Sequence, residues 1–205
     1  YYRPNAWPNT PDILPEYLQE GGRGAFIIRA TLASTLCASW GAYGPAFELM
    51  DNLPAKPGSE EYLDSEKYQL RKWPTDRADS LAPLIAVLNR ARKQNKALQH
   101  DRTLRFHPCD NPAMLCYSKT HGDNAIIVVV NTDPRNVQWS PVHLDLAALG
   151  IDPGSPYQMH DLLTDQRFRW QGSTNVVGLD PATCPVHVFR LRRHQRTEAQ
   201  FESFI

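Results

Sequence analysis

Residues 114–131, MLCYSKTHGDNAIIVVVN, decide the fold class of this chain. Segments 114–119 and 125–131 have the length of strands, and Gly122-Asp123 between them are turn residues. The segment from Ala125 to Val130 is the longest uninterrupted apolar run in the chain, and it falls far short of the roughly 18 apolar residues of a membrane span. The stretch therefore predicts two short neighbouring strands.

Strand-length segments of the same kind continue on both sides of this stretch, and turn residues such as Gly150, Gly154 and Gly172 separate them. The predicted strands are 104–107, 114–119, 125–131, 138–145, 157–161, 167–170, 176–179 and 186–191. Short strands at this regular spacing are typical of an antiparallel β-sandwich. The second half of the chain is therefore predicted to be all β.

The first half shows helical patterns instead. Residues 24–39 are apolar almost all round, which predicts a helix that is buried on most sides. Ser80 is a good N-cap, and apolar residues at helical spacing follow it, so residues 80–94 predict an amphipathic helix.

Three further segments complete the first half. Residues 12–19 predict a short turn or helix, and residues 40–49 predict a short buried strand. Residues 52–79 form a long loop rich in proline, glycine and charge, and a loop of this length inside a compact domain is usually functional.

Composition excludes several classes of function. Lys and Arg number 22 and Asp and Glu number 22, so the formal net charge is zero, which argues against a general nucleic-acid binder. The four cysteines form no CxxC pair and the seven histidines form no metal-binding pair, so we expect free thiols, no metal and no cofactor. We also expect no membrane partner and a cytoplasmic location.

Two segments carry groups suited to chemistry. Asp12 places a carboxylate on a loop stiffened by Pro11, where it could act on a proton or a cation, or could cap the turn that follows. Residues 59–68, SEEYLDSEKY, combine four carboxylates with Lys67 and two tyrosines. They could line a polar ligand pocket or form a solvated loop.

These segments also carry a family resemblance. NTPDILPEYL at 9–18, YGPAFEL at 43–49 and GSEEYLDSEKY at 58–68 resemble the C-terminal part of the α-1,4-glucan:maltose-1-phosphate maltosyltransferases, which belong to the α-amylase superfamily. The resemblance continues through residues 131–133, 160–164 and 185–191, and covers about residues 4–192.

The resemblance implies an α/β fold plus an all-β fold. Residues 1–97 would be the C-terminal end of a (β/α)8 TIM barrel, comprising strands 7 and 8 with helices 7 and 8. Residues 98–192 would be an antiparallel β-sandwich domain, and residues 193–205 a tail. Active sites of such barrels lie at the C-terminal ends of the strands. Asp12 would be the transition-state-stabilising aspartate, and Lys67 and Tyr68 would bind the substrate.

The family reaction moves a maltosyl unit from α-maltose 1-phosphate to the non-reducing end of an α-1,4-glucan with retention of configuration. Retention needs two carboxyl groups, a nucleophile and an acid/base. The resemblance implies that both lie upstream of this chain, so the chain alone is expected to be inactive and the full-length protein to be a homodimeric maltosyltransferase. The alternatives are a non-catalytic carbohydrate-binding or accessory chain, and another superfamily enzyme such as a glucan hydrolase or trehalose synthase.

Overall fold

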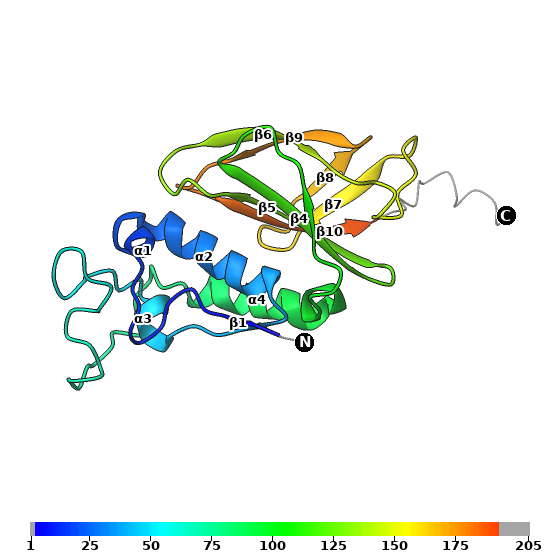
Figure 1. Cartoon of the computed structure of the whole chain (residues 1–205). Helices are drawn as coiled ribbons and strands as arrows, with labels where there is room; N and C mark the ends of the chain where they lie inside the picture. Colours follow the sequence, from blue (N-terminus) through cyan, green and yellow to red (C-terminus); the bar gives the residue numbers. More distant parts are fainter. Residues whose placement is uncertain (1–2, 193–205) are drawn as a thin grey trace.

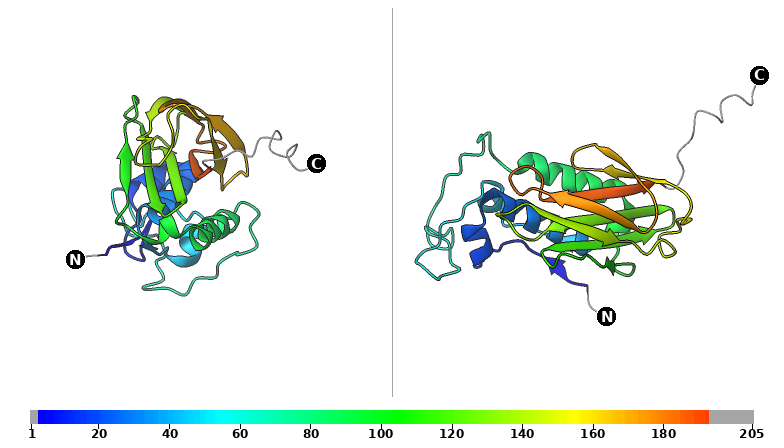
Figure 2. Two further views of the ribbon diagram at one scale, coloured as in Figure 1. Left: turned by 90° about the vertical axis from the view of Figure 1, so that its right-hand side faces the viewer. Right: turned by 90° about the horizontal axis from the view of Figure 1, so that it is seen from above.

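The computed structural model describes residues 3–192 of the 205-residue chain, and the predicted tail, 193–205, lies outside the described residues. The molecule has three layers (Figure 1): helices, a large antiparallel sheet, and a two-stranded ribbon on the other face of that sheet. Figure 2 shows the molecule from the side and from above, where the strands overlie the helices. Within the described part of the chain, no helix is long and apolar enough to cross a membrane.

The central layer is a six-stranded sheet in the order β3-β4-β5-β10-β7-β8, and every neighbouring pair is antiparallel. Its strands are β3 (Arg105–His107), β4 (Met114–His121), β5 (Asn124–Asn131), β7 (Tyr157–Asp161), β8 (Arg167–Trp170) and β10 (Val186–Arg192). The outer layer pairs β6 (Gln138–His143) with β9 (Thr174–Leu179), also antiparallel. All eight predicted strands are therefore present, which confirms the antiparallel β architecture of the second half.

Strand β5 explains why the central apolar run shows no alternation of polar and apolar residues. Ile126, Val128 and Val130 join a core cluster that includes helix residues, whereas Ile127 and Val129 join the cluster beneath the ribbon. Side chains of a strand alternate between the two faces of its sheet, so a strand that is covered on both faces needs apolar residues at every position.

The first half forms the helical layer. Its elements are β1 (Asn5–Ala6), α1 (Glu16–Glu20), α2 (Gly22–Leu36), β2 (Ser39–Trp40), α3 (Gly44–Glu48), α4 (Ala82–Gln94) and the 3-10 helix η1 (Lys96–Gln99). Strands β1 and β2 pair in parallel, and α1 and α2 connect them. The two predicted long helices are thus confirmed as α2 and α4, with ends displaced by at most three residues.

The strand predicted at 40–49 is wrong. Only Ser39–Trp40 is a strand, and residues Gly44–Glu48 form helix α3. The reason is Pro45, which stands in the first helical turn, where its missing N–H costs nothing and its fixed φ suits the helix. Leu49 N–H closes the turn by donating to the Pro45 carbonyl at 2.8 Å.

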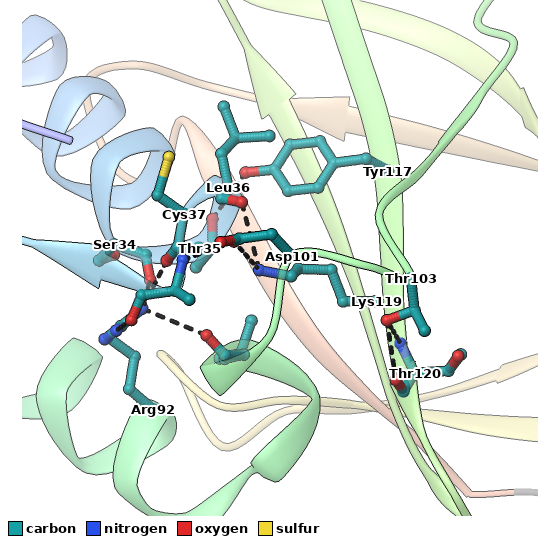
Figure 3. Close-up of polar contacts among 12 residues, drawn as sticks. Ser34, Thr35, Leu36, Cys37, Arg92, Asp101, Thr103, Tyr117, Lys119 and Thr120 are labelled. Atoms are coloured by element: carbon teal, nitrogen blue, oxygen red, sulfur yellow. Dashed lines mark hydrogen bonds and ion pairs between the residues drawn. The ribbon is translucent and has the colours of Figure 1, made fainter. Parts of the chain in front are cut away.

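Helix α2 is joined to the sheet by a buried lysine. Lys119 of β4 is only 1% exposed, and its ammonium donates to the Leu36 carbonyl at 3.2 Å and lies 3.3 Å from Asp101 Oδ1 (Figure 3). Burial lowers the pKa of Lys119, and the Asp101 carboxylate opposes that shift. The last carbonyls of a helix lack partners within the helix and carry partial negative charge, so a cation at this end satisfies both needs.

A second cation completes the cap. Arg92 of α4 donates to the carbonyls of Cys37 at 3.0 Å and Ala38 at 2.6 Å, and also contacts the Ser34 carbonyl. Asp101 Oδ1 accepts the Ala38 N–H at 2.6 Å. Helix α2 is therefore held at one end by charged groups from α4, from the sheet and from the segment between them.

Removing the lysine should weaken this junction. We expect Lys119→Met to lower the free energy of unfolding by about 1–3 kcal/mol, because the Leu36 carbonyl and the Asp101 carboxylate lose their shared donor. The matched control is Lys93→Ala, which removes an exposed lysine in the last turn of α4 and should change the stability by less than about 0.5 kcal/mol. Urea unfolding of the wild type and the two variants measures these changes in the free energy of unfolding. Equal losses in the two variants would contradict the stabilising role of Lys119.

Candidate functional site

Asp12 stands on a constrained loop that follows β1. Thr10 and Ile13 exchange two backbone hydrogen bonds of 3.1 and 3.2 Å, which closes a tight turn around Pro11 and Asp12. Arg29 of α2 donates to the Pro8 carbonyl through two nitrogens, at 2.9 and 3.3 Å. The Asp12 side chain remains 65% exposed, so the loop presents this carboxylate to solvent.

The long loop after α3 is anchored beside the Asp12 turn by one aromatic residue. Tyr62 is 2% exposed, and its hydroxyl accepts a hydrogen bond from Asn9 Nδ2 at 2.8 Å. Burial raises the pKa of Tyr62 to about 12. The Leu14 N–H donates to the Glu60 carbonyl at 2.6 Å, so the two segments also share a backbone contact. These contacts fix the middle of the loop against the turn.

Lys67 reaches Asp12 as a result. Its ammonium lies 2.7 Å from Asp12 Oδ1 and 3.0 Å from Glu61 Oε1. Hydrogen bonds with these two carboxylates raise the pKa of Lys67, so the side chain is a cation at physiological pH. The structure thus brings together two predicted site residues that are 55 positions apart (67 − 12).

The third predicted site residue, Tyr68, lies beside this ion pair and faces solvent. It is 75% exposed, and the Lys67 ammonium is 5.3 Å from the centroid of its ring. An exposed aromatic ring next to a cation and two carboxylates combines an apolar surface with donors and acceptors. This combination suits a sugar, which presents C–H groups on its faces and hydroxyl groups at its edge.

Sequence reasoning missed the residues that hold Glu66, the sequence neighbour of Lys67. The Tyr43 hydroxyl donates to Glu66, and Trp73 Nε1 donates to Glu66 Oε1 at 2.9 Å. These two bonds hold the pKa of Glu66 below its usual range. Arg71 stacks on the Trp73 ring at 3.9 Å. The Glu66 carboxylate is therefore bound by Tyr43 and Trp73, whereas Lys67 pairs with Asp12 and Glu61. The only sequence signal for the role of Tyr43 is its position in the segment 43–49, which resembles the family.

One group of described residues has the composition of a metal site. Ligand atoms of Asp161, Cys184 and His187 lie within 4.8 Å of one another. The Asp161 carboxylate is already a hydrogen-bond acceptor for His187 Nδ1 at 3.0 Å, the Thr164 hydroxyl at 2.6 Å and the Val188 N–H at 3.1 Å. Burial raises the pKa of the Cys184 thiol, which disfavours the thiolate that a metal requires. We therefore interpret the group as a structural network.

Comparison with solved structures shows the class of fold. A maltogenic α-amylase AmyB from Thermotoga neapolitana superposes with a TM-score of 0.66 at 14% identity, covering 93% of this chain and 42% of that one. A γ-CGTase from alkalophilic Bacillus clarkii gives a TM-score of 0.60 at 17% identity, covering 92% of this chain and 26% of that one. The chain therefore has the fold of part of an α-amylase-family protein.

Sequence comparison is more specific. Residues 106–191 match the family model described as GLGE, C-terminal. The chain is 45% identical over 93% of its length to an α-1,4-glucan:maltose-1-phosphate maltosyltransferase of Methylacidiphilum infernorum, 47% over 94% to enzyme 2 of that name from Streptomyces coelicolor, and 44% over its whole length to that of Myxococcus xanthus. It spans about 30% of the length of these relatives. The chain is thus similar to the C-terminal part of the maltosyltransferases.

The Asp161 network should make stability depend on pH. Burial acts to raise the pKa of Asp161, but the hydrogen bonds from His187, Thr164 and Val188 keep it below its usual range. A lowered pKa in the folded state means that the ionised carboxylate stabilises the fold above the unfolded value of about 3.9, and that this contribution is lost as the pH falls through the folded pKa.

We therefore expect Asp161→Asn to reduce the free energy of unfolding by about 1–3 kcal/mol at pH 7, with the deficit shrinking below about pH 4. Urea unfolding of both proteins between pH 7 and pH 3 measures the difference. The matched control is Asp152→Asn, an exposed loop carboxylate, which should show no comparable deficit at pH 7. A deficit for Asp161→Asn that is the same at pH 3 and pH 7 would contradict the role of the ionised carboxylate.

Proposed function

We propose that this chain is the C-terminal part of a retaining glycosyltransferase that moves maltosyl units from α-maltose 1-phosphate to the non-reducing end of α-1,4-glucans. The observation that carries the proposal is the Lys67–Asp12 contact of 2.7 Å, found in a chain whose relatives at 44–47% identity bear the maltosyltransferase name. Two exposed charged groups from distant segments meet at the place where the resemblance expects a sugar.

In this proposal Asp12 acts on the transition state. A retaining reaction passes through a sugar ring with oxocarbenium character, flanked by a nucleophile and an acid/base carboxyl. The family resemblance implies that those two carboxyl groups lie upstream of this segment. A fixed carboxylate such as Asp12 holds ring hydroxyls in the distorted shape and stabilises the developing positive charge.

Lys67 and Tyr68 bind the donor in the same proposal. The Lys67 ammonium has three donors, of which Asp12 and Glu61 use two, so it can also donate to a sugar hydroxyl. Its positive charge also suits an anionic group. The exposed ring of Tyr68 offers a flat apolar surface to a sugar face.

The domain organisation belongs to the proposal as well. Residues 1–97 are the end of a (β/α)8 barrel, with β1 and β2 as strands 7 and 8, and residues 98–192 are the all-β domain. The parallel pairing of β1 and β2 across α1 and α2 supports this, because parallel neighbours joined by helices are the repeating unit of such barrels. The homodimeric state and the cytoplasmic location of the full-length protein stay predictions.

Replacing the aspartate tests its role in the full-length protein. We expect Asp12→Ala to reduce the rate of phosphate release from maltose 1-phosphate by about a hundredfold to a thousandfold or more, because the transition state loses a fixed charge. The melting temperature should hardly change, since the side chain is exposed. Asp76→Ala, which removes another exposed carboxylate from the neighbouring loop, is the control. A near-normal rate of phosphate release by Asp12→Ala would show that Asp12 is only a turn residue.

The lysine is tested through use of the donor. In the full-length protein, Lys67→Ala should lower kcat/KM for maltose 1-phosphate by tenfold or more with little change in melting temperature. Lys72→Ala removes an exposed lysine five positions further along the loop and should leave kcat/KM unchanged. If the two variants behave alike, Lys67 is only a surface partner of Asp12 and Glu61.

A further inference from the structure

Trp139 lies flat and open on the outer face of the β6–β9 ribbon. It is 65% exposed, an unusual state for so large an apolar side chain. Trp139 pairs across the ribbon with Gly178, and a Cβ atom on Gly178 would stand 2.3 Å from the indole ring. The absence of a side chain at residue 178 therefore lets one face of the ring rest on the backbone of β9, while much of the ring stays open to solvent.

The rest of this face continues the apolar surface and ends in polar groups. Alternation along the two strands and their pairing place six residues on the outer face: Trp139, Pro141, His143, Thr174, Val176 and Gly178. Val176 is 66% exposed and pairs with Pro141. At about 3.4 Å per residue, the distance along β6 from Trp139 to His143 is about 14 Å.

The polar end of the face is ordered by hydrogen bonds. His143 contacts the Thr174 hydroxyl at 3.0 Å through Nδ1 and Asp110 Oδ1 at 2.7 Å through Nε2. Apart from His143, none of the six residues is titratable. The face therefore joins an exposed ring to hydroxyl, imidazole and carboxylate groups, with little net charge.

We propose that the outer face of the β6–β9 ribbon, defined by these six residues, binds an α-1,4-glucan chain, with a sugar ring stacked on Trp139. A rigid indole gives a large contact area at low conformational cost, and a sugar presents an apolar face of matching shape. The face carries little charge, so it does not attract an anionic polymer electrostatically. An α-1,4-glucan is uncharged and needs no such attraction. The choice of an α-1,4-glucan rests on the proposed function.

This face is separate from the Asp12–Lys67 site. Helices α2 and α4 lie against one face of the six-stranded sheet, and the ribbon lies against the other (Figures 1 and 2). Asp12 and Lys67 belong to the helical part of the chain. A polymer held on the ribbon would remain attached between transfer steps, which raises the local concentration of its chain ends without any new contact at the catalytic site.

The test is native electrophoresis of the full-length protein through gels that contain glycogen or soluble amylose. The wild-type protein should be retarded by the glucan, and Trp139→Ala should raise the apparent dissociation constant at least tenfold. Trp139→Phe, which keeps an aromatic ring, should restore most of the retardation. The matched control is Phe106→Ala, which removes another exposed aromatic residue from a strand at the edge of the sheet and should migrate as the wild type does.

Equal retardation of Trp139→Ala and wild type would overturn the proposal. It would also be overturned if Trp139→Ala left the retardation unchanged but altered the sedimentation of the protein, because the face would then contact a second copy of the chain. Phosphate release with a short maltooligosaccharide acceptor separates this proposal from the proposed function, because Trp139→Ala should leave that rate unchanged. Retardation that depends on Trp139, in a wild-type protein that releases no phosphate, would support glucan binding and contradict only the transferase.

Discussion

Two cations at the carboxyl end of α2 hold this helix to the sheet and to α4. Lys119 of β4 donates to the carbonyl of Leu36, the last residue of α2, and Arg92 of α4 donates to the carbonyls of Cys37 and Ala38, which follow it. Helix α2 also contacts the loop before α1, because Arg29 in the same helix donates to the Pro8 carbonyl. Helix α2 therefore connects the buried Lys119 of the β half with the segment that leads to Asp12, more than 100 positions away in sequence.

The Asp12–Lys67 ion pair is exposed to solvent, unlike the buried Lys119 at the end of α2. The side chains of Lys67 and Asp12 are 31% and 65% exposed, and exposed ion pairs contribute little to the stability of a fold. The chain nevertheless orders a long loop around buried Tyr62, and so positions Lys67 beside Asp12. Under the proposed function, these exposed charges serve binding of the donor and not the stability of the fold.

The fold of the β half could be predicted from the sequence because its signals are local. The strands at 157–161 and 167–170 have the predicted bounds, since apolar and polar residues alternate along both segments. The strand predicted at 40–49 failed because one proline in a helical first turn outweighed the apolar pattern. The resemblance supplied Asp12, Lys67 and Tyr68 and the expectation that Lys67 lies near Asp12. The contact of Lys67 with Glu61 and the hydrogen bond from Tyr43 to Glu66 depend on side-chain positions that no local sequence pattern predicts.

The central claim is that Asp12 and Lys67 face a sugar in one site. A crystal structure of the full-length protein with a bound maltosyl donor or a stable analogue tests this claim most directly. The account predicts the sugar within hydrogen-bond distance of the Asp12 carboxylate and the Lys67 ammonium, with the Tyr68 ring against the ligand. A ligand bound elsewhere, with the Lys67–Asp12 pair unchanged and surrounded by water, would contradict it.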